Sequence, residues 1–316
     1  MLRLFYASVA ALVCGLAAST AEAQTASRAW VSGHGTDAAG CGTPAAPCRS
    51  LQYAHDNIVA AGGEIDILDP AGYGAVSITK SISIVNDGVG TAGVQAATGA
   101  AVTINAGASG AVLLRGLDIE GVGGSYGIHF KGGASLKVQN CTIKGFTFGG
   151  IQYEPTAPGF LYVSNSSVID NLASGINVHA LMASGTGTVL ATLSHVEVVN
   201  DLYGVFIDGR DSVQGAIINA VLADSVVASN STAGVESVST ASNATTFLMV
   251  RDTTVTGSSS GADAFGGATL YLARSTLSAD GLALNPGTGG VIGSYGDNNI
   301  DNNINPGPTP TPVSFH

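Results

Sequence analysis

Apolar residues along this 316-residue chain recur in short runs in which apolar and polar positions alternate, as in half-buried β-strands. One six-residue run has apolar ends, and its copies start at intervals of 25, 30, 29, 28 and 22 residues. Intervals of this size are typical of the coils of a solenoid. About nine coils fit in the chain, so we predict an all-β, parallel β-helix. The copies are 138–143, 163–168, 193–198, 222–227, 250–255 and 272–277.

A second repeated element, of the form Gly-apolar-x-apolar, accompanies the first. Side chains alternate across a strand, so we expect the two apolar residues to face the core and the residue x to face solvent. The clear copies are 127–130, 150–153, 175–178 and 204–207, and weaker copies are 234–237 and 281–284.

The third position of the six-residue run is occupied by Asn, Asp or His. These residues tolerate a left-handed backbone better than other non-glycine residues, so the column predicts the sharp turn between two strands of a coil. We therefore interpret it as structural and do not pair its histidine and aspartates as catalytic groups. Its members are Asn140, Asn165, His195, Asp224 and Asp252.

Residues 24–63 predict an N-terminal strand, a disulfide loop and a capping helix, ahead of a β-helix over 64–305 and a flexible Pro-rich tail over 306–316. Ser50 opens the helix, and Gly62-Gly63 ends it. A helix at this position would cover the exposed end of the core. Its apolar positions, at helical spacing, are Leu51, Ala54, Ile58 and Ala61.

This N-terminal stretch carries Gly42-Thr43 through Pro47, then Ser50-Leu51-Gln52, Ala54 and Gly62-Gly63-Glu64-Ile65. It resembles the cap and first coil of the pectin-lyase-like right-handed parallel β-helix superfamily, and the repeats extend the resemblance over most of the chain. The turn column likewise resembles the asparagine ladder of pectate lyases. The resemblance implies a right-handed solenoid.

Residues 1–23 predict a cleaved secretion signal: Arg3 precedes an apolar run over 4–18, and Ala21-Glu22-Ala23 matches a cleavage site. The alternative, a buried core helix, is less favoured at the extreme N-terminus. We expect a secreted protein that is extracellular, periplasmic or on the cell surface. No later segment is apolar enough to span a bilayer, so we expect no membrane insertion.

Charge and cysteines narrow the functional classes. The net charge is −11 and only 10% of residues are charged, so the Lys/Arg surface that nucleic acid needs is missing. Cys41 and Cys48 bracket a turn-rich stretch and predict a local disulfide in an exported protein. A metal pair is a weaker interpretation, because no second Cys or His pair stands at ligand spacing. Cys141 lies in the repeat as an inert core thiol.

The superfamily resemblance implies that the Gly-apolar-x-apolar strands carry any substrate groove. Neighbouring coils lie roughly 4.8 Å apart, so their outward residues would form one polar strip. A carboxylate beside His179 could raise its pKa, Lys131 or Arg210 could act as a base near a sugar carbon, and Glu154 with Asp208 could ligate calcium. The candidate catalytic residues are Lys131, Glu154, His179, Asp208 and Arg210, and the candidate substrate-binding residues are His129, Gln152, Asn177 and Phe206.

The alternative interpretation of this strip is an ordinary solvated face. The chain lacks the clustered aspartates and catalytic arginine of pectate lyases and the spaced aspartates of polygalacturonases. We therefore expect a secreted β-helix that engages extracellular or cell-wall polysaccharide in a non-catalytic binding or surface role. A polysaccharide lyase or glycoside hydrolase acting on an acidic polysaccharide, and a structural or adhesive spacer, are the alternatives. No cofactor other than calcium is expected, and the sequence indicates no particular oligomeric state.

Overall fold

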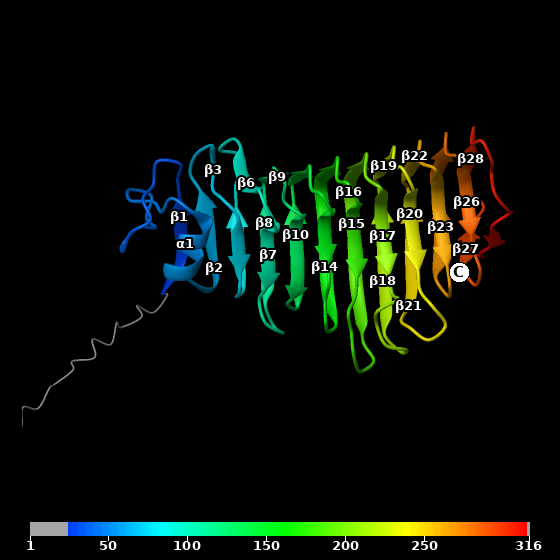
Figure 1. The fold of residues 1–316 in the computed structure, drawn as a ribbon, viewed down its shortest axis with the longest axis horizontal. Helices are drawn as coiled ribbons and strands as arrows, with labels where there is room; N and C mark the ends of the chain where they lie inside the picture. Colours follow the sequence, from blue (N-terminus) through cyan, green and yellow to red (C-terminus); the bar gives the residue numbers. More distant parts are fainter. Residues whose placement is uncertain (1–24, 315–316) are drawn as a thin grey trace, which may run out of the picture.

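The computed structural model describes residues 25–314, and the predicted signal peptide lies outside them. The chain forms a parallel β-solenoid of about nine turns, with one nine-stranded and one twenty-stranded sheet running along the stack (Figure 1). The all-β solenoid predicted from the repeats is confirmed. The only helix among the described residues is α1 (Leu51–Asn57).

The nine-stranded sheet takes one strand from each turn. Its strands are β4 (Val76–Ile78), β7 (Ala100–Asn105), β10 (Tyr126–Gly132), β13 (Gly149–Tyr153), β15 (Ser174–His179), β17 (Tyr203–Asp208), β20 (Ala233–Val238), β23 (Ser260–Phe265) and β26 (Leu282–Pro286).

The twenty-stranded sheet takes the remaining strands. They are β1 (Ala26–Val31), β2 (Val59–Ile67), β3 (Ala71–Gly72), β5 (Ile82–Val85), β6 (Ala92–Ala96), β8 (Ala111–Arg115), β9 (Leu117–Gly121), β11 (Ser135–Gln139), β12 (Thr142–Lys144), β14 (Gly159–Ile169), β16 (Thr188–Val199), β18 (Ile217–Ala223), β19 (Val226–Ala228), β21 (Thr245–Arg251), β22 (Thr254–Thr256), β24 (Thr269–Ala273), β25 (Thr276–Ser278), β27 (Val291–Ser294), β28 (Asn299–Asp301) and β29 (Thr311–Pro312).

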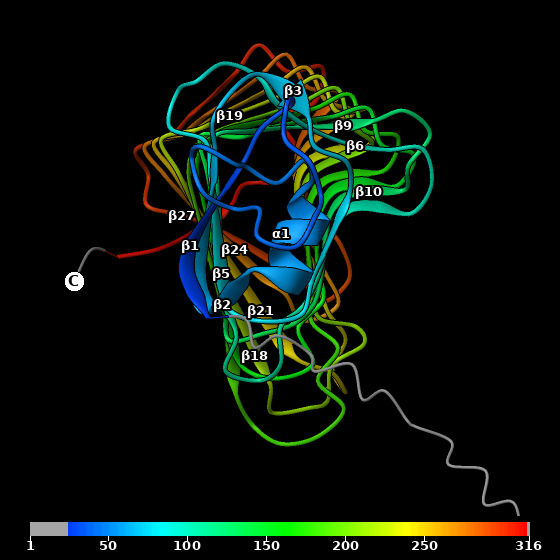
Figure 2. The same ribbon diagram turned by 90° about the vertical axis from the view of Figure 1, so that its left-hand side faces the viewer.

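At the N-terminal end, α1 packs beside β1, β2 and β4 (Figure 2). Ser50 is its N-cap and accepts a hydrogen bond from the Tyr53 backbone N–H, as predicted. The helix is shorter than predicted, because it ends at Asn57 and the following residues pair with β1 as part of β2. The β-branched Ile58 and Val59 favour this early change to strand. The Cys41–Cys48 disulfide is present, with the two Cα atoms 5.0 Å apart.

At the C-terminal end, the predicted flexible tail contains the short strand β29. Thr311 and Pro312 pair with Gly293 and Ser294 of β27, and the Val313 N–H donates to the Ser294 carbonyl. The segment boundaries at 23, 63 and 305 stay predictions.

The strand registers match the stacking of the six-residue repeat. Val138 pairs with Val163, which pairs with Leu193, and the column continues through Leu222 and Val250. The turn column is also confirmed, since all five of its predicted members have a positive φ of 49–54°. The left-handed backbone therefore explains the Asn, Asp and His side chains in that column.

The weak Gly-apolar-x-apolar copy predicted at 281–284 is two residues out of register with the strands of the nine-stranded sheet. Ala262 pairs with Leu284, so the true copy of the element in the preceding coil is Gly261-Ala262-Asp263-Ala264. The sequence pattern does not reveal this copy, because its two core positions, Ala262 and Ala264, are small residues that are only weakly apolar. Both alanines are fully buried.

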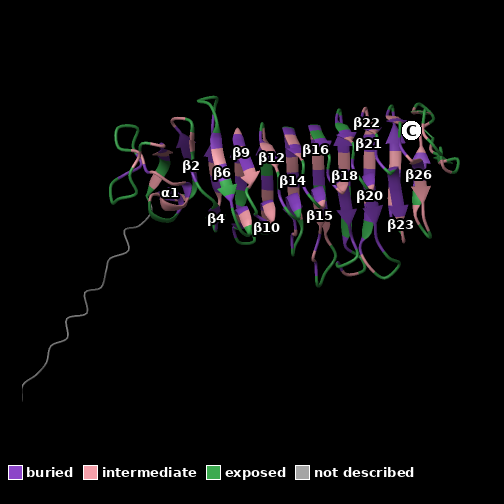
Figure 3. Ribbon diagram, turned by 45° about the horizontal axis from the view of Figure 1, so that its top comes forward, coloured by how far each residue is buried: buried purple, intermediate pink, exposed green. Residues whose placement is uncertain are grey.

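Buried and partly exposed positions alternate along strands of the twenty-stranded sheet such as β16 and β21, whereas β13 and β20 of the nine-stranded sheet are buried throughout (Figure 3). A row of polar side chains, all buried except for Asn303, runs through six successive coils inside this core. Each member directly follows a second column of left-handed residues, such as Asp170, Asn200 and Ser229, and we call the row the inner ladder. Each member accepts a hydrogen bond from the backbone N–H of the equivalent residue one coil earlier, at 2.8–3.3 Å. Its members are Asn171, Asp201, Asn230, Ser258, Asp280 and Asn303.

The inner ladder explains the glycine of the Gly-apolar-x-apolar element. A Cβ on Gly175 would lie 2.4 Å from Val198 Cγ1 and 2.5 Å from Asp201 Oδ2. A Cβ on Gly261 would lie 2.7 Å from Asp280 Oδ2. The glycine is therefore required by close packing against the ladder, not by a left-handed backbone.

We predict that Gly175→Ala lowers the free energy of unfolding by about 1–3 kcal/mol, because its methyl group would overlap Val198 and Asp201. Chemical denaturation followed by circular dichroism measures this change. Gly72→Ala is the matched control, since a Cβ there meets no atom within 4 Å. Equal stability of the two variants would contradict this account of the glycine.

The inner ladder also makes stability depend on pH. Burial raises the pKa of Asp201 to about 7, although backbone and side-chain hydrogen bonds from Asn171 oppose the shift. The unfolded carboxyl ionises near pH 4, so between about pH 4 and 7 the unfolded state releases a proton that the folded state retains. Stability should therefore fall as the pH rises through this window.

We predict that Asp201→Asn raises the free energy of unfolding by about 2 kcal/mol at pH 8 and leaves it nearly unchanged at pH 4. Thermal melts across this pH range test the prediction. Asp224→Asn, at an exposed turn position that Asn occupies in other coils, should change little at either pH. A gain from Asp201→Asn that is as large at pH 4 as at pH 8 would rule out the burial of charge as its cause.

Candidate functional site

The outer face of the nine-stranded sheet carries a row of side chains in register from coil to coil; we call it the outer row. It contains the x residue of each Gly-apolar-x-apolar element, which faces outward because the flanking apolar residues fill the core. A second row lies two positions further along each strand and includes Glu154, His179 and Asp208. The outer row is Ser77, Thr103, His129, Gln152, Asn177, Phe206, Glu236, Asp263 and Asn285.

Glu154 lies at the centre of a hydrogen-bonded cluster. His129 Nε2 is 2.6 Å from one carboxylate oxygen of Glu154, and His179 Nδ1 is 3.5 Å from the other. Gln152 donates to the same carboxylate at 2.9 Å, and Asn177 donates to the Gln152 carbonyl oxygen at 3.2 Å. Three of the predicted candidates thus meet at Glu154, and Asn177 joins them through Gln152.

His179 connects this cluster to a neighbouring loop, since its Nε2 is 2.8 Å from Asp211 Oδ2. The hydrogen bonds with His129 and His179 hold the pKa of Glu154 well below its usual range. The hydrogen bond with Glu154, supported by Asp211 and by the charge of Asp208, raises the pKa of His179 against the effect of burial. The cluster is therefore a connected set of hydrogen-bonded side chains rather than a set of free acids and bases.

Asp208 and Arg210 form a second, separate unit. Arg210 donates from Nε and from a terminal nitrogen to the Asp208 carboxylate, at 2.9 and 2.7 Å. Its guanidinium lies 5.7 Å from the centre of the Phe206 ring, which in turn stacks on Tyr203 at 5.0 Å. Lys131, the remaining candidate, is exposed at an irregularity of β10 and makes no ion pair within residues 25–314.

The outer row continues into two carboxylates that the sequence interpretation missed. Glu236 pairs in register with Phe206 on one side and Asp263 on the other, and the two acidic residues are 8% and 4% exposed. Burial, followed by repulsion from Asp263, raises the pKa of Glu236 to about 7. Asp263 accepts hydrogen bonds from Ser260 and Asn285, and burial raises its pKa as well. Glu236 is the outward residue of the weak copy 234–237, and Asp263 lies one coil further along, so the coil period could have identified both.

Aromatic rings flank the polar part of the outer row. Tyr126 lies 4.6 Å from the His129 ring and 5.6 Å from Phe148, measured between ring centres. Phe148 is 56% exposed. The Tyr203–Phe206 pair stands on the other side of Gln152 and Asn177, three coils further along the stack.

Three loops, at residues 180–187, 209–216 and 239–244, follow the carboxyl ends of β15, β17 and β20, next to the second row. They extend from the lower edge of the solenoid in Figure 1, and we call them the wall. Ser212 joins them: its hydroxyl donates to the Ala180 carbonyl and accepts from the Met182 N–H. The Ser212 carbonyl accepts from the Asn243 side chain. The wall therefore has a fixed internal structure.

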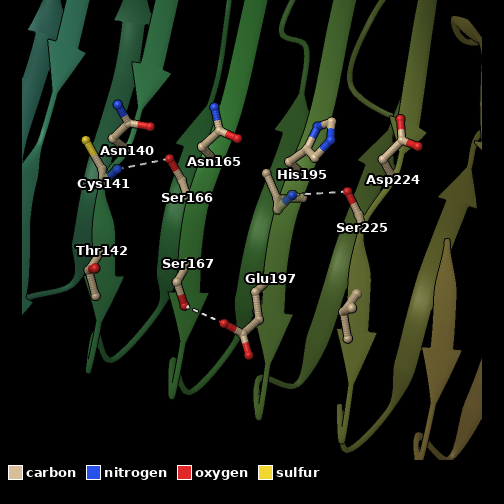
Figure 4. Close-up of a pocket in the computed structure, with 12 residues that line it drawn as sticks. Asn140, Cys141, Thr142, Asn165, Ser166, Ser167, His195, Glu197, Asp224 and Ser225 are labelled. Atoms are coloured by element: carbon tan, nitrogen blue, oxygen red, sulfur yellow. Dashed lines mark hydrogen bonds between the residues drawn. The ribbon is translucent and has the colours of Figure 1, made fainter. Parts of the chain in front are cut away.

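A groove of about 580 Å³ runs along the left-handed turns of the other sheet (Figure 4). Asn140, Asn165, His195 and Asp224 form one row of its lining, and Thr142, Ser167 and Glu197 form another. Its floor contains Cys141, whose thiol pKa is raised to about 11 by burial, which supports an inert thiol. The His195 Nδ1 contacts Ser194, and no carboxylate within residues 25–314 forms an ion pair with His195.

No family model, curated protein or solved structure matches this chain. Within residues 25–314, no helix is long and apolar enough to cross a membrane. In the same part of the chain, no three His, Cys, Asp or Glu side chains are grouped so that they could hold a metal ion.

We predict that Glu154→Gln lowers the pKa of His179, because the largest interaction that favours its charged form is lost. An NMR titration of the histidine ring protons measures the change. Asp211→Asn, which removes the weaker partner, should lower the pKa by less. The reverse order of the two shifts would mean that the loop carboxylate, not Glu154, controls His179.

Proposed function

We propose that this protein is a secreted β-solenoid that binds extracellular or cell-wall polysaccharide along the outer face of its nine-stranded sheet. The observation that carries the proposal is the outer row itself, in which hydrogen-bonding side chains stand in register between two aromatic pairs. A linear polymer laid along the stack meets equivalent positions at intervals of roughly 4.8 Å.

The chemistry of the row suits a sugar ligand. The amides of Gln152 and Asn177 can both donate and accept hydrogen bonds, as hydroxyl-rich ligands require, and they are held in place by hydrogen bonds to each other and to Glu154. Phe148 and Tyr126 offer apolar ring surface against which the carbon-bound faces of sugar rings can pack. Sites of this kind combine apolar and aromatic surface with a few placed polar groups.

Binding without turnover is favoured by the state of the predicted acids and bases. Two histidines hold the pKa of Glu154 below its usual range, and Asp208 accepts two hydrogen bonds from Arg210. A general acid or base needs a pKa near the working pH and a free proton site, and both carboxylates are engaged. Calcium binding by Glu154 and Asp208 would require these ion pairs to open, and it stays a prediction.

Three finer features belong to the same proposal. Right-handed winding is supported by the strong preference of parallel strand crossovers for that hand. Leu51 and Ala54 of α1 are fully buried at the N-terminal end, which supports the role of this helix as a cap. The disulfide supports export to an oxidising compartment, and the resemblance to the pectin-lyase-like superfamily rests on the residues quoted above.

We predict that Phe148→Ala weakens binding to the recognised polysaccharide by about five- to tenfold, since ring stacking is lost without disturbing the core. Affinity electrophoresis against a panel of neutral, acidic and amino polysaccharides, with and without calcium, measures it. Tyr162→Ala removes a partly exposed ring from the twenty-stranded sheet and serves as the control. Equal losses in both variants would place the binding surface elsewhere.

The same panel tests the alternatives. Release of unsaturated products or reducing ends that disappears in His179→Ala or Asp208→Ala would establish a lyase or hydrolase. Absence of both binding and products across the panel would leave the structural or adhesive spacer.

A further inference from the structure

The most unusual group on the outer face is the carboxylate of Glu236. Its residue is 8% exposed, yet no described side chain or backbone group donates a hydrogen bond to it or forms an ion pair with it. Buried carboxylates are normally paired, because an uncompensated charge in this position is costly. On the surface that we propose binds polysaccharide, an unpaired carboxylate points to a ligand that supplies the partner.

The groups around Glu236 define the charge of that partner. Asp208, Glu236 and Asp263 lie on the adjacent strands β17, β20 and β23, and Arg210 is the only cation among the charged groups that act on Glu236. Arg210 is already bound by two hydrogen bonds to Asp208. The cluster therefore has an excess of negative charge, and Tyr203 is close enough that both Glu236 and Asp263 raise its pKa.

We infer that Glu236 and Asp263 bind the ammonium group of an amino sugar unit in the polysaccharide held on this sheet. The inference rests on the proposed function, of which it names the ligand class. An ammonium carries three hydrogen-bond donors on one charge, which matches two carboxylates on neighbouring strands. Calcium instead needs six to eight oxygen ligands, and Asp208 is already committed to Arg210.

Tyr203 and Phe206 complete the site on the side of β17. The two rings stack at 5.0 Å. The Arg210 guanidinium lies over the Phe206 ring, and from there its charge acts on Glu236. A sugar unit whose amine reaches Glu236, which lies two coils beyond Asn177, would lie next to this aromatic pair and in line with the rest of the outer row. The ammonium thus lies on the same linear path.

Isothermal titration calorimetry with three oligosaccharides of equal length tests the inference: a glucosamine oligomer, its fully N-acetylated form and a neutral glucose oligomer. At about pH 6 the wild type should bind the glucosamine oligomer about tenfold more tightly than the N-acetylated one. Glu236→Gln should abolish that preference and keep the affinity for the N-acetylated oligomer. Glu197→Gln, which removes an exposed carboxylate from the other sheet, should keep the preference.

A second readout is independent of the variants. An ammonium stabilises the ionised form of Glu236, so binding below the free pKa of about 7 should release protons. Repeating the titration in buffers of different ionisation enthalpy measures this release. The N-acetylated oligomer should release none from this site.

The outcomes separate the two proposals. Equal affinity for the glucosamine and N-acetylated oligomers, or a preference that survives Glu236→Gln, overturns the amino sugar inference and leaves polysaccharide binding intact. Absence of binding to all three oligosaccharides overturns the inference, and it overturns polysaccharide binding as well only if the polysaccharide panel also shows no binding. A lysine pentapeptide that binds as tightly as the glucosamine oligomer, with the same dependence on Glu236, would assign the site to a protein ligand and overturn the inference.

Discussion

The structure depends on one constraint: the backbone groups and buried side chains of each coil must stay in register with those of the coil before it. Hydrogen bonds between parallel strands satisfy the backbone in straight segments. At the turns the strands lose this pairing, and buried N–H groups without partners would be costly. The inner ladder supplies those partners, because Asn171, Asp201 and Asn230 each accept from the backbone of the neighbouring coil.

The ladder in turn determines what the opposite strand can contain. Its side chains lie so close to the nine-stranded sheet that the facing position has no room for a Cβ. The glycine at that position, the apolar residues beside it and the outward residue between them are therefore parts of one arrangement. The same arrangement aligns the outward residues into rows, which is the condition for a linear binding surface.

Much of this arrangement could be predicted from the sequence, because repeated constraints leave repeated residues. The coil period, the register of Val138 on Val163 and the left-handed turns at Asn140 and Asn165 all follow from local patterns. The helix end at Asn57 did not follow, since strand pairing with β1 overrides the helical spacing of Ile58. The copy at 261–264 was missed because its alanines fill the core without an apolar signature.

The candidate site was predictable in its location and less so in its chemistry. Alternation placed His129, Gln152 and Glu154 on the outer face, but it could not show that Glu154 bridges two histidines. It also could not show that Asp208 turns back to Arg210 two residues later. These pairings depend on side-chain conformations that neighbouring coils impose. Glu236 differs from them because its neighbours repel it instead of pairing with it.

Along each strand of the nine-stranded sheet, alternate positions serve packing and the outer surface, and this separation has an evolutionary consequence. The glycine and its apolar neighbours are fixed by packing in the core, whereas the outward residue between them lies on the outer face, in register with the outward residues of adjacent coils. Substitutions in the outer row can therefore change which ligand is recognised, one coil at a time, while the glycine and apolar residues that determine the fold stay the same. A solenoid of this kind can diversify its surface as a series of separate sites on a constant frame.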